Sequence, residues 1–412
     1  MKNNDRVPGT HQKEAAYITH PRGHWSDLLA LYLLKRYGKR QVFLNEAEAR
    51  RAGWTGPIDV IGRGTFDEHD DPTLIDVEAT LAAKQLGIAE NYELQRLLAY
   101  TLSVDREGQS KGVLRIGRIV ELLYDAMPES QWHRVLTWVE VFIEAYLDEW
   151  LDRTPPASLK SEEVIDLIWQ AYHNVEGEFS DLEKTELAEI LAAYHPAMEF
   201  EPFRLPMCVA VIWRRWRKIG IRKSPLTWVE DALRAELVKQ RLFFASPPEF
   251  ENGFISEMTV SDKPAVVLGC TTENRYVHSF AFSRYGEEHF GNVVAAVVRR
   301  PNGHTMVCRK PRGEMVELWS VVAQVRAHEQ EIRGLPVSTW NELLTPRGPV
   351  GAGCWFFQQK AQRLMNGALT ALDIEPTQQS LEDVWHRLAW GIADDQLGYR
   401  RQFYLERGGK VE

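Results

Sequence analysis

The sequence predicts an α/β protein with a parallel-sheet N-terminal domain, a helical connector and a smaller α+β C-terminal domain. Three observations carry this prediction. Short apolar segments alternate with helical segments in the first part of the chain, as in a parallel sheet with crossover helices. The middle of the chain shows only helical periodicity, and strand-like apolar runs return after Pro264. At 412 residues, the chain is also too long for one ordinary core.

The N-terminal domain is expected to cover residues 12–155. Its predicted strands are AAYIT (15–19), QVFLN (41–45) and PIDVIG (57–62), and a broad apolar face predicts a helix from Trp25 to Tyr37. Further helices are expected over 73–87, 91–103, 112–126 and 129–152.

The connector and the C-terminal domain are expected over 156–245 and 246–405. A polar segment with two adjacent prolines (152–163) separates the first domain from helices over 163–243. The C-terminal strands are predicted at 265–270, 276–282, 292–300, 304–310 and 317–323. Asn302-Gly303 is the expected turn of a hairpin, and the chain after the loop 345–353 is predicted to be helical.

Composition excludes several classes of protein. No apolar run approaches the ~20 residues that span a bilayer, and the polar start MKNNDRVPGTHQKE lacks the apolar core of a signal peptide. We therefore expect a cytoplasmic protein with no membrane partner. The net charge of −9 argues against a nonspecific nucleic-acid coat, although an enzyme with a local basic groove is compatible with it. Four widely spaced cysteines form no C-x-x-C pair and are expected to be reduced: Cys208, Cys270, Cys308 and Cys354.

The segment ITHPRGHWSDLLALYLLKRYG (18–38) carries the most informative polar residues. His20 and His24 fall where a strand ends and a helix begins, and ligands bind in that crevice of open α/β sheets. Asp27 lies in the first turn of the helix, where it either binds a ligand or complements the helix dipole.

A second polar segment, IDVIGRGTFDEHDD (58–71), follows about thirty residues later. It contributes Asp59, Asp67 and His69. If both segments leave adjacent strands, their imidazoles and carboxylates converge, and such mixed ligands suit Mn²⁺, Fe²⁺ or Zn²⁺. Two metals about 3.5–4 Å apart can activate a water for phosphoryl displacement. The alternative is a plain acidic loop that caps the next helix near Thr73.

These two segments resemble the motifs of the DHH phosphoesterase superfamily, and the whole chain resembles its melanocyte-proliferating-gene family of metal-dependent hydrolases. The family pattern T-H-x-G-x-F-H-C-D-E-x-L-A reads THPRGHWSDLLA here, and its D-V-G-G-x-Y-D segment ending in D-H-H is compressed to DVIGRGTFDEH. Less specific similarities continue in SPLTWVEDAL (224–233), PAVVLGC (264–270), VVAAVVRRPNGHTMVCRK (293–310) and LPVSTWNEL (335–343).

The resemblance implies a DHH-like N-terminal domain with a bound divalent metal, Mn²⁺ first, with Mg²⁺, Fe²⁺ and Zn²⁺ as alternatives. Ligand-type positions of the family are matched by His20, His24, Asp59 and His69, and Asp67 matches the first letter of D-H-H. The family also takes a late Asp ligand from a helix, for which Asp148, or Glu144, is the candidate.

Four departures bear on whether catalysis is retained. Ser26 stands where the family has a ligand Asp, and Asp27 stands where it has Glu. Glu68 replaces the first His of D-H-H, and Gln358 replaces a C-terminal His. Because Ser26 removes an anion from the site, one metal in place of two, a different metal or lost catalysis all stay open.

Candidate contacts to the substrate come from other parts of the chain. Arg214 and Arg217 lie in IWRRWRKIGIRK (212–223), which suits phosphates and stacked bases or, as the alternative, is an amphipathic helix with solvated arginines. In DHH-type enzymes a second domain closes over the substrate phosphate, and His304 and Arg347 are the candidates for that role here.

The resemblance implies a metal-dependent phosphoester hydrolase, a phosphodiesterase or exonuclease that acts on RNA or small nucleotides. Two alternatives remain. One is a catalytically degenerate subunit of a larger complex that binds a nucleotide or nucleic acid. The other is a hydrolase of pyrophosphate or polyphosphate. A homodimer is also open.

Overall fold

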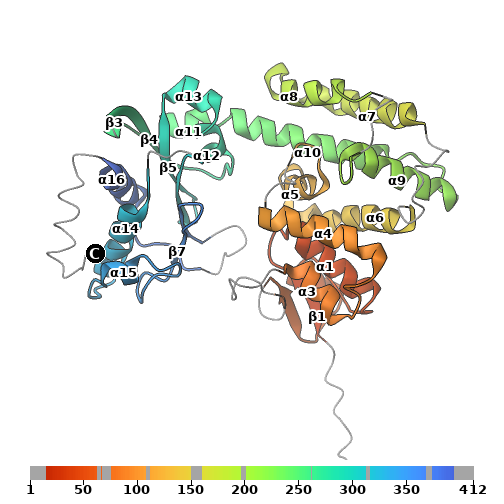
Figure 1. Cartoon of the computed structure of the whole chain (residues 1–412), viewed down its shortest axis with the longest axis horizontal. Helices are drawn as coiled ribbons and strands as arrows, with labels where there is room; N and C mark the ends of the chain where they lie inside the picture. Colours follow the sequence, from red (N-terminus) through yellow and green to blue (C-terminus); the bar gives the residue numbers. More distant parts are fainter. Residues whose placement is uncertain are drawn as a thin grey trace, which may run out of the picture. The chain divides into compact units, whose positions relative to one another are not determined.

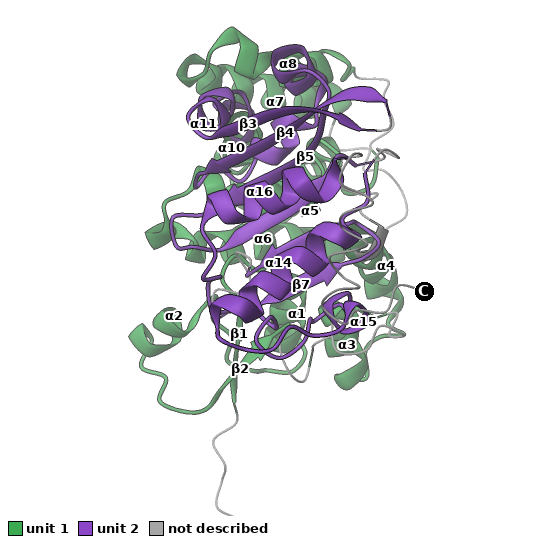
Figure 2. Ribbon diagram, turned by 90° about the vertical axis from the view of Figure 1, so that its left-hand side faces the viewer, with its two compact units in different colours: residues 1–238 green, residues 239–412 purple. Residues whose placement is uncertain are grey.

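The computed structural model describes residues 15–62, 66, 76–107, 112–149, 160–195, 201–260, 262–311, 316–367 and 374–393. Helices and strands both contribute, so the predicted mixed α/β class is confirmed (Figure 1). The chain forms two compact units, Met1–Val238 and Lys239–Glu412 (Figure 2).

A small parallel sheet organises the start of the first unit. Strands β1 (Ala16–Thr19) and β2 (Ile58–Ile61) pair in parallel, with Ala16 opposite Ile58 and Thr19 opposite Ile61. The third expected strand, 41–45, is reduced to a single parallel bridge between Val42 and Tyr17. Because β1 and β2 run in the same direction, their carboxyl ends meet at one edge of the sheet.

Helix α1 (Trp25–Arg36) is the buried centre of this unit. Every residue from Trp25 to Leu34 is buried, including the polar Ser26 and Asp27. Leucine and alanine favour the helix, and a helix that is apolar nearly all round is covered on all sides. The two buried polar residues in its first turn therefore need partners inside the protein.

The remaining helices of the first unit agree with the helical periodicity of the sequence, and α10 crosses the boundary between the units. They are α2 (Glu46–Arg51), α3 (Glu78–Gln85), α4 (Tyr92–Glu107), α5 (Ile116–Ala126), η1 (Glu129–Gln131), α6 (His133–Glu149), α7 (Ser161–Val175), η2 (Glu176–Glu178), α8 (Asp181–Ala192), α9 (Leu205–Lys218) and α10 (Leu226–Phe244). Trp138 of α6 stacks on Trp228 of α10 with ring centroids 4.0 Å apart, and each indole N–H donates to the carbonyl of the other residue.

The second unit is built on a six-stranded sheet with the order β3-β4-β5-β6-β8-β7. Only β4 and β5 pair in parallel, and all other neighbours are antiparallel. The strands are β3 (Phe254–Val260), β4 (Lys263–Thr271), β5 (Val293–Arg299), β6 (Thr305–Arg309), β7 (Trp355–Gln358) and β8 (Arg363–Asn366).

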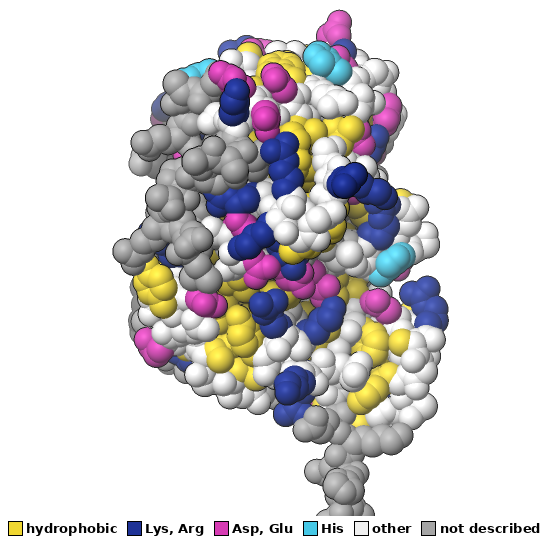
Figure 3. All heavy atoms as spheres, turned by 90° about the vertical axis from the view of Figure 1, so that its right-hand side faces the viewer, with side chains coloured by type: hydrophobic (Ala, Val, Ile, Leu, Met, Phe, Trp, Pro, Cys, Tyr) yellow, Lys and Arg dark blue, Asp and Glu magenta, His cyan; other side chains and the backbone are white. Residues whose placement is uncertain are grey.

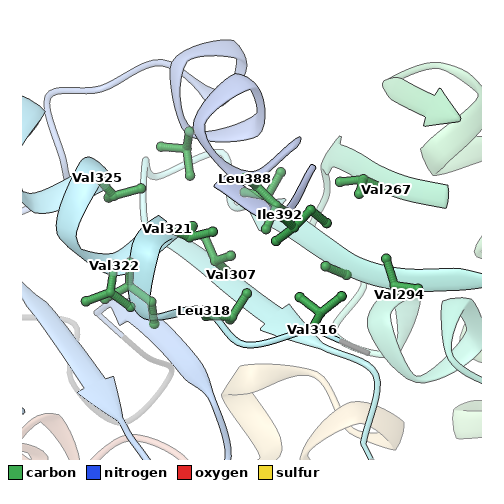
Figure 4. Close-up of a cluster of buried hydrophobic side chains, with 14 of the residues drawn as sticks. Val267, Val294, Val307, Val316, Leu318, Val321, Val322, Val325, Leu388 and Ile392 are labelled. Carbon is green, nitrogen blue, oxygen red and sulfur yellow. The ribbon is translucent and has the colours of Figure 1, made fainter. Parts of the chain in front are cut away.

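Helices cover this sheet. Helices α14 (Trp319–Ile332) and α16 (Leu381–Ile392) bury an aliphatic cluster against one face, in which Val321 and Leu388 meet Val307 (Figure 4). The shorter helices are α11 (Pro247–Glu251), α12 (Val277–Ala281), α13 (Arg284–Phe290) and α15 (Trp340–Leu343). A second apolar cluster joins α11 and α12 to residues of β4 and β5.

Three predictions for this unit are wrong. The expected strand 276–282 is α12, and the expected strand 317–323 contains the start of α14. Short apolar runs do not distinguish a buried strand from a buried helix; Val321, Val322 and Val325 belong to the helical period. The region expected to be purely helical after residue 353 also contains β7 and β8.

Candidate functional site

The candidate site lies at the carboxyl ends of β1 and β2, where His20 follows one strand and Gly62 the other. His20 is only 8% exposed, and its Nε2 lies 3.1 Å from Asp27 Oδ2. Its Nδ1 lies 3.0 Å from the carbonyl oxygen of Pro21. A carbonyl only accepts, so Nδ1 carries a proton, which in the neutral imidazole leaves the lone pair on Nε2.

Asp27 is fully buried and only partly satisfied. Its Oδ2 accepts the backbone N–H of His24 at 2.7 Å, which caps the start of α1. Its Oδ1 has no hydrogen-bond partner among the described residues. A buried carboxylate beside the lone pair of an imidazole is unfavourable unless a proton on Nε2 or a bound cation compensates the charge.

Gly62 lies beside the His20–Asp27 pair, and its neighbours identify a third side chain at this site. Its φ of +77° suits glycine, and a Cβ built on it would lie 3.3 Å from His20 Cδ2, 3.4 Å from Asp27 Oδ1 and 3.6 Å from Glu78 Oε1. Three polar side chains therefore approach one point beside the Cα of Gly62. Glu78 was not found by sequence reasoning, because no motif contains it and only the tertiary fold brings α3 to this edge.

Glu78 is tied to α1 through Ser26. Both residues are buried, and Ser26 Oγ donates to Glu78 Oε2 at 2.5 Å. We call His20, Asp27 and Glu78, with Ser26, the strand-end cluster. Its acids come from the first turns of two helices, where the helix dipole favours negative charge.

His24 borders the strand-end cluster and is more accessible. Its ring centroid lies 5.5 Å from that of His20, its Nδ1 lies 3.7 Å from Glu121 Oε1, and its side chain is 46% exposed. Burial works to lower the pKa of His24, but the hydrogen bond with Glu121 and the charges of Asp27, Glu121 and Asp105 raise it above its usual value. His24 therefore lies at the edge of the strand-end cluster, surrounded by carboxylates.

Three predicted site residues lie outside the described residues or away from the cluster. Asp67 and His69 are outside the described ranges, as is Glu68. Asp59 is exposed in the middle of β2, opposite Tyr17. It precedes Gly62 by three residues, which is about 10 Å of extended chain. The structure therefore does not bring Asp59 to His20.

The candidate late ligand is not at this site. Asp148 and its alternative Glu144 both pair with Arg215, at 2.7 and 2.8 Å. Asp148 also lines a cleft of about 380 Å³ together with Arg36, the last residue of α1. The cluster is at the other end of that helix, where Asp27 is nine residues from Arg36, or about 14 Å along the axis. Asp148 stabilises the packing of α6 against α9.

The predicted arginines of α9 are engaged in ion pairs. Arg214 pairs with Glu149 at 3.5 Å, and Arg217 pairs with Glu163 at 3.2 Å. On the face drawn in Figure 3, Lys and Arg side chains lie among Asp and Glu side chains and do not form one basic field. This pattern agrees with the amphipathic-helix interpretation of the segment.

The two candidates in the second unit differ in exposure. His304 is buried, and its ring nitrogens lie 2.9 Å from the Ile374 carbonyl and 3.3 Å from Asn302 Nδ2. These contacts hold the β5–β6 turn in place, and the contact of His304 with a substrate stays a prediction. Arg347 is exposed in a loop of the same unit.

No group of three or more His, Cys, Asp or Glu side chains in the described ranges is arranged to hold a metal ion. The described donors are still of the right kind. His20 Nε2 is an imidazole nitrogen 3.1 Å from Asp27 Oδ2, and Asp27 Oδ1 is a carboxylate oxygen without a hydrogen-bond partner in the described part of the chain. They form part of a ligand set and would need further members.

Comparisons with known proteins add little. No family model matches the chain, and no curated protein matches it. Among solved structures, the chain is similar to an uncharacterized protein from Helicobacter pylori G27, with 7% identity over 92% of this chain and 99% of that chain and a TM-score of 0.19. So low a TM-score does not indicate a common fold. None of the helices in the described ranges is long and apolar enough to span a membrane.

Proposed function

We propose that the strand-end cluster is the divalent-metal centre of a phosphoester hydrolase that acts on RNA or small nucleotides. One observation carries the proposal: the ring edge of His20 (Cδ2) and the buried, unpartnered Oδ1 of Asp27 both lie near Gly62, and His20 Nε2 lies 3.1 Å from the other oxygen of the same carboxylate, where a cation would compensate the charge. The resemblance of THPRGHWSDLLA and DVIGRGTFDEH to the DHH motifs supports the same assignment.

The donor chemistry suits Mn²⁺, with Fe²⁺, Zn²⁺ and Mg²⁺ as alternatives. His20, Asp27 and Glu78 would hold the ion. Asp67 and His69, the further ligands that the resemblance implies, lie outside the described residues. Such an ion supplies Lewis acidity to a water and to a phosphoryl oxygen. The bond from His20 Nδ1 to Pro21 keeps Nε2 as the donor atom, because a hydrogen bond at one ring nitrogen fixes the tautomer that a histidine ligand presents.

His24 and Arg22 lie in the turn beside the cluster, each paired with an acid of α5. The raised pKa of His24 favours its imidazolium form, and its half-exposed side chain can contact an anionic substrate. Arg22 is held by Asp125 at 2.5 Å and lies 5.2 Å from the ring centroid of Trp132. Both residues belong to the turn between β1 and α1, so they share one short segment with His20 and Asp27.

A turnover assay tests the proposal. Purified protein is incubated with Mn²⁺ and labelled RNA, single-stranded DNA, a cyclic dinucleotide or pyrophosphate. We expect His20→Ala and Asp27→Asn to abolish turnover and to remove bound metal measured by mass spectrometry. The matched control is His173→Ala, because His173 pairs with Glu176 on an exposed part of α7. Turnover that persists in His20→Ala would contradict the site assignment.

The second candidate function is binding without cleavage, by a subunit of a larger complex. The Ser26–Glu78 hydrogen bond favours it, since a hydroxyl stands where the resembling family has a metal-binding carboxylate and part of Glu78 is committed to that hydroxyl. In that case the protein retains Mn²⁺ and a nucleotide, but no substrate is cleaved. Cleavage of pyrophosphate alone would instead favour the pyrophosphatase alternative.

A further inference from the structure

One face of α5 packs against the turn between β1 and α1. Glu121 and Asp125 are four residues apart, so they lie on the same face of the helix. Glu121 Oε1 is 3.7 Å from His24 Nδ1, and Asp125 Oδ1 is 2.5 Å from Arg22 Nη2. The α5 face therefore holds two residues of the turn that precedes Asp27.

Tyr124 lies between these two acids on α5 and points into the protein. It is only 2% exposed, and its hydroxyl has no hydrogen-bond partner among the described residues. Its ring packs edge-on against Trp132 with centroids 5.4 Å apart, and the Trp132 indole donates to the Tyr124 carbonyl at 3.1 Å. Packing therefore fixes the ring, while its polar group is left unsatisfied.

Tyr124 is next to Asp125 and three residues from Glu121, the two acids that hold Arg22 and His24 in the turn before Asp27. Burial raises the pKa of Tyr124, the negative charge of Asp27 raises it further, and the positive charge of Arg22 opposes this. The phenol thus keeps its proton and is available as a donor. Asp27 Oδ1 is a buried acceptor without a donor in the same surroundings. A buried donor or acceptor without a protein partner is usually satisfied by an ordered water or an ion.

We infer that Tyr124 is a positioning residue of the candidate metal centre: its hydroxyl donates through one water to the Asp27 carboxylate and orients it toward the ion. This inference rests on the proposed function. Hydrogen bonds to ligand carboxylates fix their direction, and their loss typically lowers metal affinity about 10–100-fold. The resembling motifs do not include Tyr124, which lies on α5.

The test is a Mn²⁺ titration of the full chain by calorimetry, for wild type, Tyr124→Phe and Tyr194→Phe. Tyr194 is the matched control, because it is a buried tyrosine of the same unit whose hydroxyl also lacks a partner in the described part of the chain. We expect the Mn²⁺ Kd to rise about 10–100-fold in Tyr124→Phe and to stay unchanged in Tyr194→Phe. Metal-free Tyr124→Phe should unfold at the same denaturant concentration as wild type.

The outcomes separate the two proposals. Equal Kd values for wild type and Tyr124→Phe would overturn the role of Tyr124 and leave the metal centre standing. Wild type that binds no Mn²⁺ would overturn both. If Tyr124→Phe does not fold, a fluorinated tyrosine at position 124 keeps the ring and strengthens the donor; an unchanged Kd for that protein would overturn the inference.

Discussion

Ser26 Oγ donates a 2.5 Å hydrogen bond to Glu78 Oε2, and this bond joins the first turn of α1 to the first residue of α3. The other oxygen of Glu78, Oε1, lies near Gly62, and so does Asp27 Oδ1. The serine that replaces an expected aspartate therefore does not leave the cluster with a single carboxylate. Ser26 instead bonds to a second carboxylate, that of Glu78, which lies on α3 and outside the sequence motifs.

Ser26→Ala tests the importance of this bond for stability. The change leaves a buried carboxylate oxygen without its hydroxyl donor, so the free energy of unfolding should fall by about 1–3 kcal/mol. Urea denaturation measures it. Ser103→Ala is the control, because Ser103 Oγ donates to the Tyr100 carbonyl within one helix at a partly buried position; its effect should stay within about 0.5 kcal/mol. Equal losses for both variants would show that the Ser26–Glu78 bond is unimportant.

Gly62→Ala tests the approach of three side chains to one point. A Cβ at position 62 would contact His20, Asp27 and Glu78 at 3.3–3.6 Å, and the φ of +77° is unfavourable for alanine. Both stability and Mn²⁺ affinity should therefore fall. Gly53→Ala is the matched control, since Gly53 has a φ of +82° but a Cβ added there would meet nothing within 4 Å. Gly53→Ala should lose about 1–2 kcal/mol from backbone strain alone, with unchanged metal binding. Similar Mn²⁺ affinities for the two variants would argue against the cluster.

The His24–Glu121 pair should make stability depend on pH. The folded-state pKa of His24 is raised, so the stabilisation is fully present below the unfolded value of about 6.5 and is lost as pH rises through the folded-state pKa. Wild type should therefore exceed Glu121→Gln in stability at acidic pH, and the difference should shrink at alkaline pH. Both side chains are partly exposed, so we expect less than about 1 kcal/mol. Denaturation at several pH values and NMR titration of His24 check this, and a difference that grows with pH would contradict it.

His278 should give the second unit the opposite pH dependence. Burial and the charges of Arg363 and Arg300 lower its pKa to about 4. A histidine with a depressed folded-state pKa stabilises fully above the unfolded value of about 6.5, and this stability is lost as pH falls from there toward 4. The loss should reach up to about 3 kcal/mol at about 1.36 kcal/mol per pKa unit. In His278→Gln, denaturation midpoints of the second unit should vary less between these pH values. An unchanged pH dependence would contradict the assignment.

Much of the fold could be predicted from local sequence. Alternating apolar segments placed β1 and β2, the leucine-rich run placed α1, and Asn302-Gly303 marked the turn between β5 and β6. Sequence reasoning was less successful where only tertiary packing decides. The run 276–282 forms α12 because it packs over β4 and β5, and QVFLN keeps only the Val42 bridge.

The candidate site was predictable in part, for the same reason. His20 and Asp27 lie seven residues apart in one strand-turn-helix segment, so spacing was enough to bring them together. Glu78 and Tyr124 come from α3 and α5, and their relation to Asp27 depends on how those helices pack around α1. The sequence could not show that Asp148 lies near Arg36, because its position within α6 does not reveal which end of α1 it approaches.

The most direct test of the central claim is anomalous diffraction from crystals soaked in Mn²⁺. We expect an anomalous peak within coordination distance of His20 Nε2 and Asp27 Oδ1, beside the Cα of Gly62, and its absence from crystals of His20→Ala. Soaked wild-type crystals with no peak at this position would contradict the account.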